Sequence, residues 1–230
     1  MPRDVGVVVV AAGRGSRLGR ETPKQYQPIG GVPMVLRAVR PFVTHPDVAQ
    51  VALVLPLADA EHPPAFLRGV AGAGLMVVAG GAERADSVAA GLRALGPDCT
   101  VVLVHDAARP FVERAVIDAV IAYARAGEGA IAAVRVTDTL KQAAPDDPTQ
   151  VARTVPRDAL WRAQTPQGFP RAVLERAHAA AREAGSATDD ASLVERTGVP
   201  VRLVPDSPRN MKVTTSEDLA LAELLVGRGG

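Results

Sequence analysis

Runs of apolar, mostly β-branched residues recur along the chain and predict the strands of a sheet. They lie at Val5–Val10, Val51–Leu55, Leu75–Ala79, Val101–Val104, Ile131–Val136 and Val201–Val204. Apart from Arg135 and Arg202, the runs contain no charged residue and do not alternate with polar ones, which is typical of strands covered on both faces. The pattern therefore predicts a buried sheet.

Segments of helical composition separate these runs. They lie at Met34–Val43, Arg84–Leu95, Arg114–Arg125, Arg171–Ala184 and Glu217–Val226. Alternating strands and helices form right-handed crossovers, which produce a mostly parallel sheet between two layers of helices. A chain of 230 residues favours one domain. We therefore predict an α/β fold with a single domain over residues 1–230.

The stretch from Thr137 to Trp161 interrupts this alternation. It contains three prolines and two short candidate strands on either side of the turn APDDPT. A hairpin of this kind is marginal by itself and needs another surface to pack on. We therefore predict a protruding arm at about residues 137–160 that joins two copies of the chain, with an ordinary surface loop as the alternative.

Composition and charge limit the classes of function. Hydrophobic residues make up 47% of the chain, and no apolar run approaches the ~18 residues that a membrane span requires. The 26 Lys and Arg residues nearly balance the 25 Asp and Glu residues, without the basic excess typical of nucleic-acid-binding proteins. Cys99 is the single cysteine, and the amino terminus lacks the pattern of a secretory signal. We expect a cytoplasmic protein that binds neither nucleic acid nor membrane.

The glycine-rich turn AAGRGSRLG after the first apolar run is the main candidate for an anion site. Backbone amides near Gly13 and Gly15 can form an anion-binding nest. Four basic residues accompany them, namely Arg14, Arg17, Arg20 and Lys24. The turn does not match a Walker loop, and it fits a dinucleotide fingerprint poorly because Gly19 comes one residue late. A nucleoside triphosphate is the remaining interpretation.

Further motifs along nearly the whole chain then identify a family. After GRGSRLG and TPKQY come GGAERADSV, VHDAARPF, DTLK, TVPR, QTPQGF, TDDAS and NMKVTTSEDLALAE. This order resembles nucleotidyltransferases that activate phosphorylated sugars and polyols, and most closely the 2-C-methyl-D-erythritol 4-phosphate cytidylyltransferase family. The resemblance implies a Rossmann-like nucleotidyltransferase fold with a protruding β-arm. Because the match reaches nearly the end of the chain, we expect no cyclase domain fused to the transferase domain.

The same resemblance implies a reaction. The enzyme would transfer the cytidylyl group of CTP to 2-C-methyl-D-erythritol 4-phosphate, giving the CDP-linked methylerythritol and pyrophosphate in non-mevalonate isoprenoid precursor synthesis. It would need Mg²⁺ and act as a homodimer. Both substrates are anions, and two unit charges 4 Å apart repel by roughly 4 kcal/mol at an effective dielectric of 20. The basic residues would offset that repulsion and stabilise the transition state.

The resemblance also assigns residues to the nucleotide. Arg17 and Lys24 would stabilise the transition state on the CTP side. The positions that would hold CTP are Ala11, Ala12, Gly13, Gly15, Gly80, Gly81, Arg84, Ser87 and Asp106. Asp106 is in addition the candidate magnesium ligand, since it ends a buried strand and Mg²⁺ takes few protein ligands. Without the resemblance, GGAERADSV would be interpreted as a glycine turn that leads into a crossover helix.

On the acceptor side the resemblance assigns Arg109, Thr139, Arg157 and Lys212. Lys212 would orient the attacking phosphate, and Arg109 would face the polyol phosphate. Thr139 and Arg157 lie in the predicted arm and would reach the site of the neighbouring subunit. Arg209 stands where the family often has an acidic residue, which argues against a metal role at that position.

Several alternatives remain open. A ribitol 5-phosphate cytidylyltransferase would have nearly the same nucleotide half, and a CTP-binding module without catalysis would need no basic residues on the acceptor side.

Asp189 and Asp190 could form a metal pair, but adjacent carboxylates before a helix favour a capping role. Adjacent side chains in a strand point to opposite faces, so His105 should point away from Asp106 and belong to the core.

Overall fold

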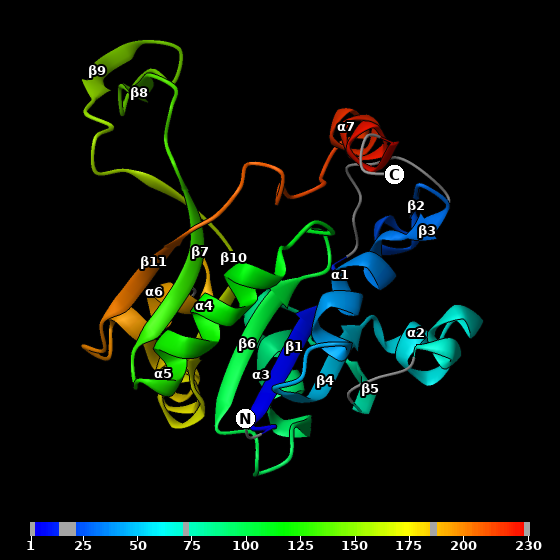
Figure 1. The fold of residues 1–230 in the computed structure, drawn as a ribbon. Helices are drawn as coiled ribbons and strands as arrows, with labels where there is room; N and C mark the ends of the chain where they lie inside the picture. The colour runs from blue at the N-terminus through cyan, green and yellow to red at the C-terminus, as the bar shows by residue number, and fades with distance from the viewer. Residues whose placement is uncertain (1–2, 14–21, 71–73, 185–187, 228–230) are drawn as a thin grey trace.

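A seven-stranded sheet forms the centre of the protein (Figure 1). The strands in spatial order are β11 (Val201–Pro205), β7 (Gly129–Arg135), β10 (Trp161–Pro170), β6 (Val101–Asp106), β1 (Val5–Val10), β4 (Val48–Leu55) and β5 (Gly74–Ala79). All pairings are parallel except those of β10, which runs antiparallel to both of its neighbours. The predicted mostly parallel sheet is confirmed. The structure, a computed structural model, describes residues 3–13, 22–70, 74–184 and 188–227.

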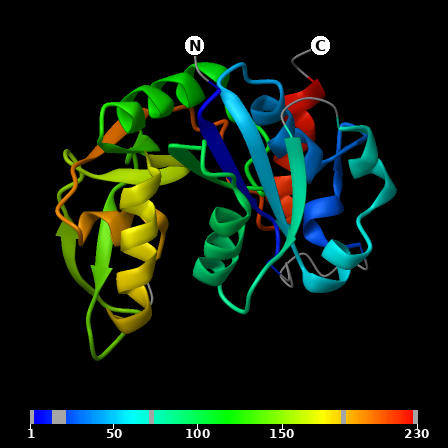
Figure 2. The same ribbon diagram turned by 90° about the horizontal axis from the view of Figure 1, so that it is seen from below.

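Helices cover both faces of the sheet (Figure 2). One face carries α1 (Met34–Val43) and α4 (Arg114–Arg125), whose apolar side chains pack on β1, β4 and β6. The other face carries α3 (Arg84–Ala94), α5 (Arg171–Ala184) and α6 (Asp190–Glu195). Each of the five predicted helices forms, and three of them have the predicted bounds. The strands β1, β4, β6 and β7 are buried along most of their length, which explains their apolar runs, whereas the edge strands β5 and β11 are more exposed.

A smaller cluster packs beside the sheet. It joins α7 (Ser216–Gly227) to the short pair β2 (Pro28–Ile29) and β3 (Val32–Pro33), through buried Ile29 and Leu219 among others. Further short elements are the helix α2 (Leu57–Glu61) and the 3₁₀ turns η2 (Lys24–Tyr26) and η3 (Ala65–Gly69). Within the described part of the chain, each helix is too short or too polar to cross a bilayer.

The pattern of apolar runs did not predict β10. Its sequence WRAQTPQGFP has no such run, and its buried residues include Gln164, Thr165 and Gln167. Specific hydrogen bonds satisfy part of this polarity: Gln167 Oε1 accepts the amide of Ala191, and Thr165 Oγ1 accepts the amide of Asp106. A central strand can therefore be polar where its neighbours supply matching partners.

The predicted arm contains the two expected strands, β8 (Leu140–Ala143) and β9 (Val151–Val155), which pair antiparallel. They project beyond the end of β7 and away from the sheet (Figure 1). Most of their residues are exposed within this chain. An isolated two-stranded hairpin gains little from burial.

Candidate active site

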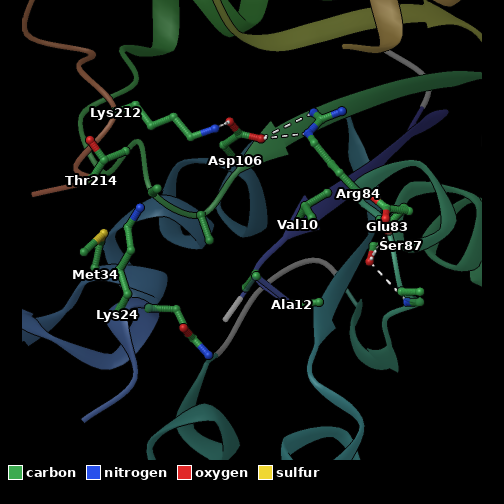
Figure 3. A pocket seen from close by; sticks show the side chains of 17 residues that line it. Val10, Ala12, Lys24, Met34, Glu83, Arg84, Ser87, Asp106, Lys212 and Thr214 are labelled. Carbon is green, nitrogen blue, oxygen red and sulfur yellow. Dashed lines mark hydrogen bonds and ion pairs between the residues drawn. The ribbon is translucent and has the colours of Figure 1, made fainter. Parts of the chain in front are cut away.

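A pocket of about 260 Å³ opens at the carboxyl ends of β1 and β6. Its walls are the end of β1, the 3₁₀ turn at Lys24, the turn before α3, the end of β6 and the segment around Lys212. Figure 3 shows Lys24 and Lys212 on one side of the pocket and Arg84 and Ser87 on the other. Ligands of open parallel α/β sheets bind at this edge, because the strand ends and the helix entries meet there.

The turn between β5 and α3 is fitted tightly to the end of β1. A Cβ atom at Gly80 would lie 2.4 Å from Ala12 Cβ and 2.9 Å from Ser87 Oγ, so the backbone could not approach as closely with any other residue. The amide of Gly81 donates to Ser87 Oγ at 3.2 Å. Glu83 and Asp86 form a reciprocal capping box at the start of α3. These contacts fix the glycine turn as one wall of the pocket.

Charged side chains form a further boundary of the pocket and connect its two sides. Lys212 Nζ lies 2.7 Å from Asp106 Oδ2, and the Arg84 guanidinium lies 3.3 Å from Asp106 Oδ1 (Figure 3). Burial would raise the pKa of Asp106, but the charges of Arg84 and Lys212 outweigh it and hold the pKa well below its ordinary value. Asp106 is therefore ionised at neutral pH.

A second cavity, of about 270 Å³, shares this boundary. Arg84, Asp106 and Lys212 line both cavities, and the second is completed by Arg109, β10 and the segment at Thr188 and Asp189. Among the described residues, buried side-chain atoms without a hydrogen-bond partner include Arg109 Nε, Gln164 Oε1 and Asn210 Oδ1. Arg109 and Gln164 belong to the lining of this cavity. The lining of the second cavity thus contains side chains with buried polar atoms that have no hydrogen-bond partner among the described residues.

The structure brings most of the predicted nucleotide residues together. The first pocket is lined by Ala11, Ala12, Gly13, Lys24, Gly81, Arg84, Ser87, Asp106 and Lys212. Gly80 lies directly behind it against Ala12. The predictions for Gly15 and Arg17 lie outside the described residues, as do those for Arg14 and Arg20.

The predicted acceptor residues divide into two groups. Arg109 lines the second cavity, where its guanidinium donates to the carbonyl of Asn210 at 2.8 Å. Thr139 and Arg157 lie in the exposed arm and line neither cavity of the chain as described. Arg157 instead donates to the carbonyl of Thr137. A single chain therefore does not bring the arm residues to the site.

The interpretations of the acidic pair and of the buried histidine are also resolved. Asp189 caps α6 by accepting the amide of Ser192 at 3.0 Å, as predicted. His105 is fully buried between Thr165 and the carbonyl of Arg109, and burial lowers its pKa to about 4, so it is a neutral core residue. No group of three or more His, Cys, Asp or Glu side chains suited to a metal occurs within the described ranges.

Sequence reasoning missed one charged contact at the site. Asp190, which the sequence groups with Asp189 as a capping residue, is buried and lies 2.7 Å from Arg84 Nη1. Sequence reasoning also missed Asn210, whose amide donates to Thr165 O and to Asp206. The motifs TDDAS and NMKVT contain both residues, but spacing along the chain does not show which strand a side chain will meet.

Comparison with known proteins decides the family. The family model described as "IspD: 2-C-methyl-D-erythritol 4-phosphate cytidylyltransferase" matches residues 5–228. The chain belongs to the 2-C-methyl-D-erythritol 4-phosphate cytidylyltransferase family. It is accordingly an enzyme of the non-mevalonate pathway, which converts CTP and 2-C-methyl-D-erythritol 4-phosphate into the CDP-linked methylerythritol.

Relatives and solved structures agree with this assignment. The 2-C-methyl-D-erythritol 4-phosphate cytidylyltransferase of Frankia casuarinae is 45% identical over 97% of this chain and 82% of its own length. The crystal structure of the Thermus thermophilus enzyme of that name has a TM-score of 0.79 and 38% identity, over 97% of this chain and 99% of that one. The bifunctional enzyme IspD/IspF of Rhodospirillum rubrum is 46% identical over 96% of this chain, which spans 56% of that longer protein.

Proposed function

We propose that the first pocket holds CTP, that the second holds 2-C-methyl-D-erythritol 4-phosphate, and that the reaction takes place at their common boundary. The observation that carries this proposal is the set of charged side chains, Arg84, Asp106 and Lys212, that lines both cavities. An oxygen of the acceptor phosphate forms a bond to the α-phosphorus of CTP. The bond from the α-phosphorus to the bridging oxygen breaks, and that oxygen leaves with pyrophosphate.

The nucleotide site uses backbone as well as side chains. The amides of Ala12 and Gly13 face the triphosphate in this proposal, and the role of Lys24 is to offset charge that develops on the phosphoryl group. Gly80, Gly81 and Ser87 surround the base and ribose. Gly15 and Arg17 complete the triphosphate site in this proposal. It follows that loss of a basic residue here should affect turnover more than binding.

The acceptor site is supported by its polar lining. The cations Arg109 and Lys212 and the polar residue Gln164 line the second cavity, so a polyol phosphate would meet charges and hydrogen-bonding groups that match its own. Lys212 orients the attacking phosphate. No general base is required, because a phosphate dianion is already a nucleophile, and neutral, buried His105 belongs to the core.

The arm supplies the remaining residues in trans. We place Thr139 and Arg157 of one subunit at the acceptor site of the other, within a homodimer. The support is that the arm projects away from its own sheet, with strands too exposed to be stable alone (Figure 1). The 230 residues otherwise form one nucleotidyltransferase domain in this proposal.

The described residues also fit a magnesium ion brought by the nucleotide. Mg²⁺ prefers substrate phosphate oxygens, water and one or two carboxylates. Asp106 is an ionised carboxylate in the lining of both cavities, and it would be the protein ligand. When bound, the ion offsets negative charge on the triphosphate.

The proposal is tested with the pure protein, CTP, Mg²⁺ and each of two acceptors. We expect release of pyrophosphate and formation of the CDP-linked product with 2-C-methyl-D-erythritol 4-phosphate, and far slower turnover with ribitol 5-phosphate. Preference for ribitol 5-phosphate would overturn the assignment of the acceptor. CTP binding without turnover of either acceptor would indicate a binding module instead of an enzyme.

A further inference from the structure

Arg84 is one cation shared by two carboxylates. Its guanidinium lies 2.7 Å from Asp190 Oδ2 but 3.3 Å from the nearer oxygen of Asp106. The Asp190 side chain is only 1% exposed, whereas that of Asp106 is 12% exposed and also faces Lys212 at 2.7 Å. The shorter contact, in the more buried surroundings, is the one that fixes the position of Arg84.

Asp190 is itself held in place from several directions. His178 Nε2 on α5 lies 2.9 Å from Asp190 Oδ1, and an ionised carboxylate accepts here, so the imidazole donates. Burial would raise the pKa of Asp190, but the hydrogen bond from His178 and the charge of Arg84 keep it below its ordinary value. The adjacent residue Asp189 is fixed by Gln167 of β10 at 2.8 Å. The carboxylate therefore has little freedom to move.

The other partner of Arg84 is Asp106, and anionic substrates would compete with this carboxylate for Arg84 and Lys212. Asp106 and Lys212 line both cavities, so bound anions must rearrange their ion pair. The described residues that line the two cavities do not include Asp190. Because its side chain is buried, a ligand in either cavity would not contact it directly. Its contact with Arg84 involves a different guanidinium nitrogen from the contact with Asp106, so loss of the Asp106 contact would leave it in place.

We infer that Asp190, oriented by His178, is a positioning residue that keeps the Arg84 guanidinium aimed at bound CTP. This role rests on the nucleotide site proposed above, and neither the family assignment nor the capping interpretation of TDDAS includes it. A purely structural role is the alternative, because the contact also joins α6 to the start of α3.

The chain offers a matched control for that alternative. Arg171, at the start of α5, donates to the carbonyls of Leu92 and Leu95 at the other end of α3. Arg171→Gln would weaken the packing of α3 on its neighbours at that end of the helix and would leave the contacts of Arg84 unchanged. A structural role predicts similar losses in Asp190→Asn and Arg171→Gln.

The experiment measures CTP affinity by calorimetry on the full chain, together with the melting temperature. We expect Asp190→Asn to weaken CTP binding by about tenfold, the size of one charge-assisted hydrogen bond, and Arg171→Gln to change it by less than about twofold. In an Arg84→Gln background, Asp190→Asn should add no further loss. Additive losses in the double variant would overturn the inference, as would equal losses in Asp190→Asn and Arg171→Gln.

Variants of His178 keep the inference testable if Asp190→Asn does not fold. His178→Gln retains a donor for Asp190 Oδ1 and should bind CTP nearly as well as the unchanged protein, whereas His178→Leu should bind it several-fold more weakly. Equal affinity of these two variants would overturn the inference. Failure of the unchanged protein to bind CTP, or full affinity of Arg84→Gln, would instead contradict the proposed nucleotide site.

Discussion

Lys212 Nζ lies 2.7 Å from Asp106 Oδ2, and through this pair the segment after β11 meets the carboxyl end of β6. The two residues are separated by about half the chain but share the lining of both cavities. Because Arg84 approaches the other oxygen of Asp106, one carboxylate balances two cations. Binding of two anionic substrates here would shift those cations from the protein carboxylate to phosphate.

The first prediction concerns Asp106 and acid stability. Its pKa is lowered in the folded protein, so the unfolded chain binds a proton at a higher pH than the native one does. The resulting stabilisation is fully present above the unfolded pKa of ~3.9 and is lost as the pH falls below it. Urea unfolding at pH 5 and pH 3 should show a smaller drop in the free energy of unfolding for Asp106→Asn than for the unchanged protein.

The exposed carboxylate Asp98 provides the control for that measurement. Asp98→Asn should show the same drop between pH 5 and pH 3 as the unchanged protein. An equally steep drop in Asp106→Asn would mean that Asp106 is not ionised preferentially in the folded state.

The second prediction concerns Lys24, which lines the first pocket, where we propose that CTP binds. Lys24→Ala should lower kcat by roughly 10²–10³, as removal of a group that stabilises transition-state charge does. The dissociation constant of CTP should change far less, since ground-state contacts remain. Steady-state kinetics and calorimetry on one preparation would check this, and equal losses in kcat and CTP affinity would contradict the role.

The third prediction concerns the close approach at Gly80. A Cβ atom there would lie 2.4 Å from Ala12 Cβ, so Gly80→Ala must displace either β1 or the turn before α3. We expect a destabilisation of about 1–3 kcal/mol from overpacking, together with weaker CTP binding. Gly69 is a suitable control, because a Cβ atom at Gly69 would meet nothing within 4 Å. If Gly80→Ala matched Gly69→Ala in urea unfolding and CTP affinity, the turn would not be the tight wall described.

The fourth prediction tests the contribution of the arm in trans. Arg157→Ala should raise the KM for 2-C-methyl-D-erythritol 4-phosphate, because Arg157 would contact that acceptor from the partner subunit. After exchange of subunits with Lys24→Ala, half of the dimers would be mixed and each would have one intact site. At an acceptor concentration far below the KM of Arg157→Ala, where both variants are nearly inactive, activity should then recover to roughly a quarter of that of the unchanged protein, as expected for isologous dimers. If the mixture stayed as inactive as its components, Arg157 would act within its own subunit or not at all.

The sequence by itself determined the layered α/β fold, since the six predicted strands and five predicted helices all form. Continuous apolar runs identify strands buried on both faces because each side chain there must leave water. The order of the motifs also identified the family, which the full-length comparisons confirm. Residues adjacent to those runs, such as Asp106 after VVLVH, could be placed at the sheet edge from sequence alone.

Only the tertiary structure decided the position of β10 and the partners of the charged residues. β10 is polar, so hydrophobic periodicity has no signal there, and hydrogen bonds with neighbouring elements place it in the sheet. Asp190 likewise follows Asp189 in sequence, yet it contacts Arg84 across 106 positions of the chain. An ion pair depends on the distance between two side chains in space, which local sequence does not encode.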